Sequence, residues 1–241
     1  MNAGPGAPPR VRYRVRFAKI DLLRWISHRD LAMLWDRLGR RVGLHFSMTE
    51  GFHPKPRINF PSALALGIES DNEIVELDLE TPLEPAELLS RLISDAQPGL
   101  TIHRVERLPD GFGKSRVATL HYRIDPPDGM SVDEIDAGIA RVQSTETAVL
   151  KRKKKDSTVV LADQIHSLSR RDDGSIELVQ RDIAGALIKP DELIAMMPID
   201  DFVRRGGKVR RTDVRLSNPY TGDDAATAAS SSPPNTFFTH E

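Results

Sequence analysis

The stretch Arg10–Ile20, RVRYRVRFAKI, alternates strictly between two kinds of side chain. Valine, tyrosine, valine and phenylalanine occupy the odd positions from 11 to 17, and arginine occupies every even position from 10 to 16. In a β-strand a period of two places neighbouring side chains on opposite faces. The stretch therefore predicts a half-buried strand with one apolar face and one row of arginines.

An amphipathic helix is predicted directly after this strand. Ser27 and Asp30 have the spacing of an N-terminal capping pair. Apolar residues then recur at helical spacing, at Leu31, Leu34, Trp35, Leu38 and Val42. Gly43 suits the end of such a helix.

The rest of the first half continues a βαββαβ order. Residues Ile58–Ile68 and Asn72–Glu80 are predicted as two strands around a turn at Glu69–Asn72. Glu84–Ala96 reads as a helix, and Leu100–Leu108 reads as a strand. The second half repeats this order, with the strongest hairpin signal at Asp173–Gly174 and further elements at Val117–Asp125, Ser131–Val142, Thr158–Arg170, Ser175–Arg181, Lys189–Met197 and Lys208–Leu216.

Two consecutive βαββαβ patterns predict an α+β protein built from two tandem ferredoxin-like units with antiparallel sheets. The first, basic unit is expected over residues 10–110 and the second over residues 115–216. Residues 1–9 and 217–241 contain too few apolar side chains to offset the entropy of ordering them. They are predicted to be disordered.

Composition limits the chemistry. The chain has 241 residues, 39% of them hydrophobic, and no cysteine. That excludes disulfides, cysteine-ligated zinc and an iron–sulfur cluster held by the chain itself. The seven histidines show no metal-ligand spacing, so no metal or bound cofactor is expected. There is no long apolar run and no signal-peptide core, which predicts a cytoplasmic protein without membrane contact.

The net charge of −1 conceals an asymmetry. Residues 1–60 carry 12 basic and 4 acidic side chains, a net charge of +8, whereas residues 61–100 carry 1 and 9, a net charge of −8. The basic segment is interpreted as a surface that meets anions.

The arginine row of the first strand has two interpretations. It could be the solvated face of a half-buried strand. Alternatively, Arg12, Arg14 and Arg16, with Lys19 at the strand end, could contact phosphates, which would neutralise side chains that otherwise repel one another. At the helix start, Ser27 and Asp30 are explained by capping, whereas His28 and Arg29 project where free backbone N–H groups favour a phosphate.

Gly51–Phe60, GFHPKPRINF, places two prolines around a lysine. Each proline pushes the residue before it towards extended backbone. His53, Lys55 and Arg57 would then project to one side, as a pre-organised cationic finger. The alternative is a rigid turn that only orients the next strand.

Two other motifs carry less. His28–Trp35, HRDLAMLW, begins like a protein-kinase catalytic loop, but Trp35 stands where a metal-binding asparagine is needed and no glycine-rich loop precedes it. Lys151–Lys155, KRKKK, is either a solvating basic loop or a clamp for nucleic acid from the second unit.

The segment from Arg10 to about Leu108 closely resembles the N-terminal signature of a bacterial radical-SAM-associated domain family of unknown function. The resemblance rests on Arg16, Phe17 and Lys19, on the run Arg24–Leu31, on Ser47, on Phe52–Phe60 and on Ala65–Gly67. The spacing between Ser47 and Gly51 is one residue longer than in the family pattern. The closing KVRRTDV, Lys208–Val214, resembles the family's final Arg-Thr motif. Family members stand alone or are fused to cobalamin-binding radical SAM enzymes, and this chain resembles the stand-alone form.

Three functions are compatible with these features. The favoured one is a non-catalytic RNA-binding module that presents a tRNA or rRNA to a radical SAM, cobalamin-binding partner. The second is a metal-independent endoribonuclease in which His28 or His53 acts as general acid or base and Arg29 or Lys55 stabilises the phosphorane. The third is a protein-only adaptor that docks through the acidic stretch Glu69–Glu87.

Overall fold

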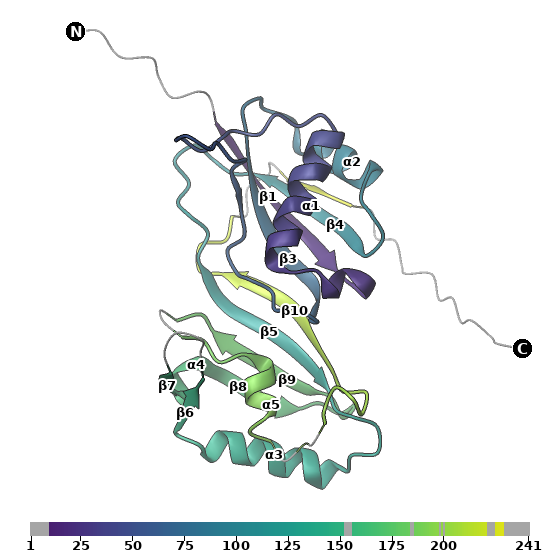
Figure 1. The fold of residues 1–241 in the computed structure, drawn as a ribbon, viewed down its shortest axis with the longest axis vertical. Helices are drawn as coiled ribbons and strands as arrows, with labels where there is room; N and C mark the ends of the chain where they lie inside the picture. Colours follow the sequence, from purple (N-terminus) through teal and green to yellow (C-terminus); the bar gives the residue numbers. More distant parts are fainter. Residues whose placement is uncertain are drawn as a thin grey trace, which may run out of the picture.

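The computed structural model describes residues 10–151, 156–183, 186–197, 199, 201–220 and 225–228. In this part of the chain, five α-helices accompany a nine-stranded sheet in which almost all neighbouring strands are antiparallel (Figure 1). The strand order is β11-β4-β1-β3-β10-β5-β9-β8, and β2 pairs with β3 outside this path. The predicted α+β class is confirmed.

The strands of the large sheet are β1 (Val11–Lys19), β2 (Ile58–Asn59), β3 (Glu69–Leu79), β4 (Leu100–Arg107), β5 (Val117–Asp125), β8 (Ile165–Arg170), β9 (Ile176–Arg181), β10 (Lys208–Leu216) and β11 (Ala225–Thr227). A separate hairpin is formed by β6 (Thr147–Leu150) and β7 (Ser157–Val160). The helices are α1 (His28–Arg41), α2 (Pro85–Ser94), α3 (Val132–Ser144), α4 (Leu161–Gln164) and α5 (Pro190–Ile194), with a 3-10 turn η1 at Asp21–Trp25.

In the first half, α1 and α2 lie on one face of β4, β1 and β3 (Figure 1). The odd-numbered side chains of β1 face these helices, as their alternation predicts, and pack with Trp35 of α1 and Leu88 of α2 in one buried cluster. Ser27 and Asp30 form the predicted capping box at the start of α1. A second buried cluster joins β5, β9 and β10 to α3 and α5 in the other half, where Ser131 caps α3 in the same way.

The two halves share the sheet through β3 and β10. These strands run parallel, with Arg210 beside Glu69 and Arg211 beside Ser70. The guanidinium of Arg211 donates to Glu73, to the carbonyl of Ala63 at 3.0 Å and to the hydroxyl of Tyr122 at 2.9 Å. Burial raises the pKa of the Tyr122 hydroxyl, which keeps it neutral beside this pair.

The strand predicted over Ile58–Ile68 is wrong beyond Asn59. The residues after β2 instead form an irregular connection near the boundary between the two halves. Leu64 is buried there, and the Gly67 N–H donates to the Arg24 carbonyl at 2.8 Å. The predicted turn at Glu69–Asn72 is the beginning of β3, because β10 supplies backbone partners there. Those partners lie far away in the sequence.

Two other predictions need correction. The strand expected over Thr158–Arg170 is divided by the short helix α4, whose Gln164 side chain is buried and bonds the backbone at Ala186 and Ile188. The tail expected to be disordered from residue 217 contains β11, which pairs with β4 along Glu106, Val105 and Arg104. An unpaired edge of β4 gives these few residues hydrogen-bond partners that composition does not reveal.

Candidate nucleic-acid interface and inter-half groove

The arginine row of β1 is neutralised within the chain. Arg12 Nε lies 3.1 Å from Asp78, Arg14 Nη2 lies 3.5 Å from Glu76, and Arg16 Nη1 lies 3.4 Å from a carboxylate oxygen on β10, that of Asp213. Asp78 and Glu76 belong to β3, directly opposite Arg12 and Arg14 in the antiparallel register. The basic segment and the acidic segment of the sequence are therefore neighbours in the sheet, where their charges form ion pairs.

Two of the predicted anion-binding side chains are buried. Arg14 donates to Ser115 at 2.6 Å, and its guanidinium carbon lies 5.4 Å from the ring centre of Phe112 in the β4–β5 connection. Lys19 Nζ donates to the Ile26 carbonyl at 3.2 Å, and burial lowers the pKa of its ammonium group. Neither side chain presents its charge to solvent.

The start of α1 presents two side chains of the predicted site. The Ser27 hydroxyl is occupied by the backbone N–H and carboxylate of Asp30. His28 and Arg29 are exposed, and the His28 ring packs edge-on against Phe60 with ring centres 5.0 Å apart. No ion pair engages either side chain within the described part of the chain.

The GFHPKPRINF stretch forms the tip and one arm of a hairpin. Met48 and Pro56 form a β-bridge between the two arms. Nearer the tip, the Thr49 N–H donates to the Lys55 carbonyl at 2.8 Å, and the Lys55 N–H donates to the Thr49 hydroxyl at 2.9 Å. Gly51 allows the tip to turn because its φ of 116° is accessible only to glycine without strain. The hairpin is thus held by its own backbone.

The side chains at this tip point into solvent. Phe52 is 100% exposed, and His53 and Lys55 are exposed as well. Arg57 is half-buried and contacts the other arm of the hairpin, where its Nε donates to the Met48 carbonyl at 3.0 Å. The tip therefore offers one aromatic ring and two titratable side chains, rather than the row of three cations predicted from the sequence.

The helix start and the hairpin tip do not meet. Phe60, which contacts His28, directly follows the C-terminal end of β2. The hairpin precedes the N-terminal end of the same strand. From the C-terminal end of α1 the chain continues to Phe46, which forms a β-bridge with Leu79 beside the base of the hairpin. A fourteen-residue helix is about 20 Å long, so His28 and the tip lie at opposite ends of α1.

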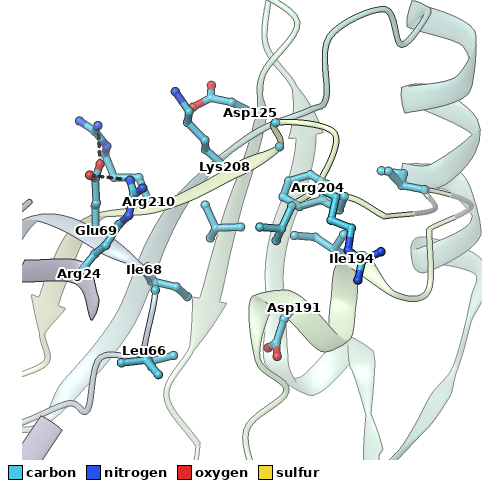
Figure 2. A pocket seen from close by; sticks show the side chains of 18 of the residues that line it. Arg24, Leu66, Ile68, Glu69, Asp125, Asp191, Ile194, Arg204, Lys208 and Arg210 are labelled. Carbon is cyan, nitrogen blue, oxygen red and sulfur yellow. Dashed lines mark hydrogen bonds and ion pairs between the residues drawn. The ribbon is translucent and has the colours of Figure 1, made fainter. Parts of the chain in front are cut away.

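A groove that sequence reasoning missed lies where the two halves meet. It has a volume of about 710 Å³ and a largely apolar lining, and its walls come from both halves. Figure 2 shows Leu66 and Ile68 on one side, with Ile194, Asp191 and Arg204 on the other. Trp25, beside Arg24, also lines it. The stretches that carry the family resemblance at Arg24–Trp25, Ala65–Gly67 and Lys208–Arg210 all contribute to this groove.

Trp25 packs against its neighbours Arg24 and Gly67. The guanidinium carbon of Arg24 lies 5.1 Å from the centre of its ring, and a Cβ added at Gly67 would lie only 3.1 Å from its Cζ3. Gly67 also has a φ of 83°, so glycine is required both for the turn and for the close approach of the indole. Even so, Trp25 is 55% exposed towards the groove.

Charges around the groove are balanced. Glu69 accepts from Arg24 at 3.3 Å and from Arg210 at 2.8 Å (Figure 2). Among the lining residues, the four basic side chains are matched by four acidic ones, at Arg24, Arg204, Lys208, Arg210, Glu69, Asp125, Asp191 and Asp201. The groove therefore has no excess of positive charge to attract phosphates.

The described residues contain no group of three or more histidine, cysteine or acidic side chains placed to hold a metal. In the same part of the chain, no helix is long and apolar enough to cross a membrane. Of the basic run Lys151–Lys155, residues 152–155 lie outside the described residues, and Lys151 is exposed.

A protein-family model described as "uncharacterized protein conserved in bacteria" (DUF2344) matches residues 12–190. No curated protein matches the chain.

Proposed function

The chain belongs to the DUF2344 family of uncharacterised proteins conserved in bacteria, and from this premise we propose that it is a non-catalytic RNA-binding module that presents RNA to a modifying enzyme. The observation that carries the proposal is the hairpin tip. A fully exposed phenylalanine stands beside an exposed histidine and lysine on a backbone that is already ordered.

Phe52 suits an unpaired nucleobase. Stacking of a base on an aromatic ring contributes about 1–3 kcal/mol and tolerates any sequence. Lys55 and His53 would contact the adjoining phosphates, and the paired Thr49–Lys55 backbone limits the conformational entropy lost on binding. His28 and Arg29 would form a second phosphate contact about 20 Å away, a separation that an extended strand of a few nucleotides spans.

The partner of this proposal is a radical SAM, cobalamin-binding enzyme that acts on tRNA or rRNA. Its support is the resemblance of the Arg10–Leu108 segment to the radical-SAM-associated family. The architecture would be two ferredoxin-like units. That view is supported by the strand orders β4-β1-β3-β2 and β10-β5-β9-β8, which place corresponding elements of the two halves in the same positions.

The other two functions receive less support. His28 and His53 lie at opposite ends of α1, so an endoribonuclease would have to use either histidine without the other as its acid–base partner. The acidic stretch proposed as an adaptor surface contains β3, whose Glu73, Glu76 and Asp78 are buried. These carboxylates neutralise arginines of the chain itself.

Fluorescence anisotropy with labelled tRNA and rRNA fragments tests the proposal. At 50 mM salt we expect binding, and we expect Phe52→Ala to weaken it about tenfold and Lys55→Ala to weaken it less, because a lost stack removes more free energy than one exposed charge. Val149→Ala is the matched control, since Val149 is an exposed apolar residue on the β6–β7 hairpin.

Absence of binding at 50 mM salt would exclude the proposal. Equal RNA affinity of the Phe52→Ala variant and the wild type would show that the hairpin tip is not the RNA-binding surface. Incubation of the same RNAs in EDTA distinguishes the endoribonuclease, which would cleave them and lose that activity in His28→Ala or His53→Ala.

A further inference from the structure

Exposed apolar side chains line the groove between the halves. Besides Trp25, Leu66 is 62% exposed and Val203 is 74% exposed, and both line the groove. Leu22, in the same 3-10 turn as Trp25, is 83% exposed. Folded monomers seldom leave a large contiguous apolar patch in water, and such patches mark contact surfaces.

The arrangement has the features of a protein-binding site. Tryptophan and arginine are both enriched among energetically dominant interface positions. Trp25 already contacts Arg24 and lies against Gly67, which reduces the side-chain entropy lost on binding. Apolar residues of both halves line the same groove, so a bound segment that covers them would remove Trp25 from water.

Charge decides between classes of partner. Arg24 pairs with Glu69, Arg210 pairs with both Glu69 and Asp71, and the lining as a whole is balanced. A phosphate backbone would have to break these pairs without a net electrostatic gain. An uncharged apolar segment would leave them intact at the rim, which is the usual division of an interface into an apolar core and a polar border.

We propose that this groove binds an uncharged, apolar segment of another protein, with Trp25 as its anchor and Leu66 and Val203 as its two walls. A small molecule would fill the 710 Å³ of the groove but would leave Leu22 exposed beyond it. None of the proposed RNA contacts, at Phe52, Lys55 and His53 or at His28 and Arg29, lines the groove, so the proposal does not depend on whether the chain binds RNA.

Selection of displayed random peptides against the full chain tests this proposal. Peptides are first depleted on the Leu66→Glu variant, which adds a charge at a solvent-exposed position and leaves the core untouched. We expect the enriched peptides to be apolar and without net charge. A synthetic copy should change the fluorescence of Trp25, whereas Trp25→Phe, which retains only the buried Trp35, should give no response.

Variants establish the location. Leu66→Glu and Val203→Glu should each weaken binding of the synthetic peptide at least tenfold, and Val149→Glu, at 63% exposure, should leave it unchanged. Circular dichroism confirms that all three variants are folded. Four outcomes would overturn the proposal: no enrichment over the depleted library, enrichment of charged peptides, displacement of the peptide by single-stranded RNA, or a wild-type dimer in sedimentation that Leu66→Glu dissociates.

Discussion

Arg211 Nη1 lies 3.1 Å from a carboxylate oxygen of Glu73, and this ion pair joins β10 to β3 with both side chains buried. The two residues come from different halves of the chain. Burial disfavours the charge of Arg211, but Glu73 and the Tyr122 hydroxyl outweigh it and raise the pKa of the guanidinium. Each charge is tolerated out of water because the other is present.

Removing one member of this pair is expected to cost more than the pair itself contributes. Arg211→Leu leaves Glu73 buried and without this partner, and breaking a buried pair in this way typically costs about 3–5 kcal/mol. Urea denaturation should show that loss. Arg40→Leu, which breaks the exposed pair with Asp36, should change the free energy of unfolding by less than about 1 kcal/mol. Similar losses in both variants would mean that Arg211 does not have this role.

Gly67→Ala should destabilise the protein more than Gly174→Ala. Both glycines have a positive φ, 83° and 82°, so both substitutions incur a backbone strain of about 1–3 kcal/mol. Only at Gly67 would the new Cβ press on an indole, since nothing lies within 4 Å of a Cβ at Gly174. Urea denaturation should separate the two variants, and Gly67→Ala alone should shift the Trp25 emission. Equal destabilisation with unchanged emission would contradict the close contact.

Arg14→Glu should prevent stable folding instead of selectively weakening RNA binding. The new carboxylate would be buried beside Glu76 and Glu106, which lie 3.5 and 3.8 Å from the guanidinium in the native protein. An uncompensated buried charge costs several kcal/mol, about 3–5 in comparable cases. Thermal unfolding monitored by circular dichroism checks this, with the exposed Arg141→Glu on α3 as control. A stably folded Arg14→Glu protein would show that the arginine row is free to bind ligands.

His121 should make a measurable contribution to acid sensitivity. Burial, together with the nearby Arg215, lowers the pKa of the His121 imidazole below its ordinary value of 6.5. The unfolded chain therefore takes up this proton at a higher pH than the folded one, and stability falls as pH drops below 6.5. His121→Gln should lose less stability than wild type between pH 7.5 and pH 5 in urea titrations. His45→Gln, at an exposed position in the first half, serves as the comparison, and parallel curves for His121→Gln and wild type would contradict the assignment.

Local patterns predicted the elements whose partners are also local. The alternation of Val11–Phe17 and the Ser27–Asp30 capping pair required only neighbouring residues, and both are present. The path of Phe60–Ile68 could not be inferred in this way. Its conformation depends on Arg211, which donates to the Ala63 carbonyl from well over a hundred residues away.

The candidate site was predicted only in part, for a related reason. The prolines around Lys55 indicated a stiff loop, but the bonds from Thr49 that hold it and the exposure of Phe52 follow from the hairpin register. The +8 and −8 segments suggested an external anion, whereas β1 and β3 place Arg12 opposite Asp78. From the sequence, Trp25 could equally be a core residue. Its place in the groove depends on how the two halves pack together, which no local pattern reveals.

The position of β10 also governs the order in which the molecule is assembled. It lies between β3 and β5 in the sheet, although it is synthesised after β9. On the ribosome, α1 and α2 can cover β1, β3 and β4 early, whereas the Glu69 end of β3 and one edge of β5 stay open until Leu216 has emerged. Open edges recruit other strands. A chain interrupted before Lys208 would therefore not be a working half-protein but a substrate for aggregation and proteolysis.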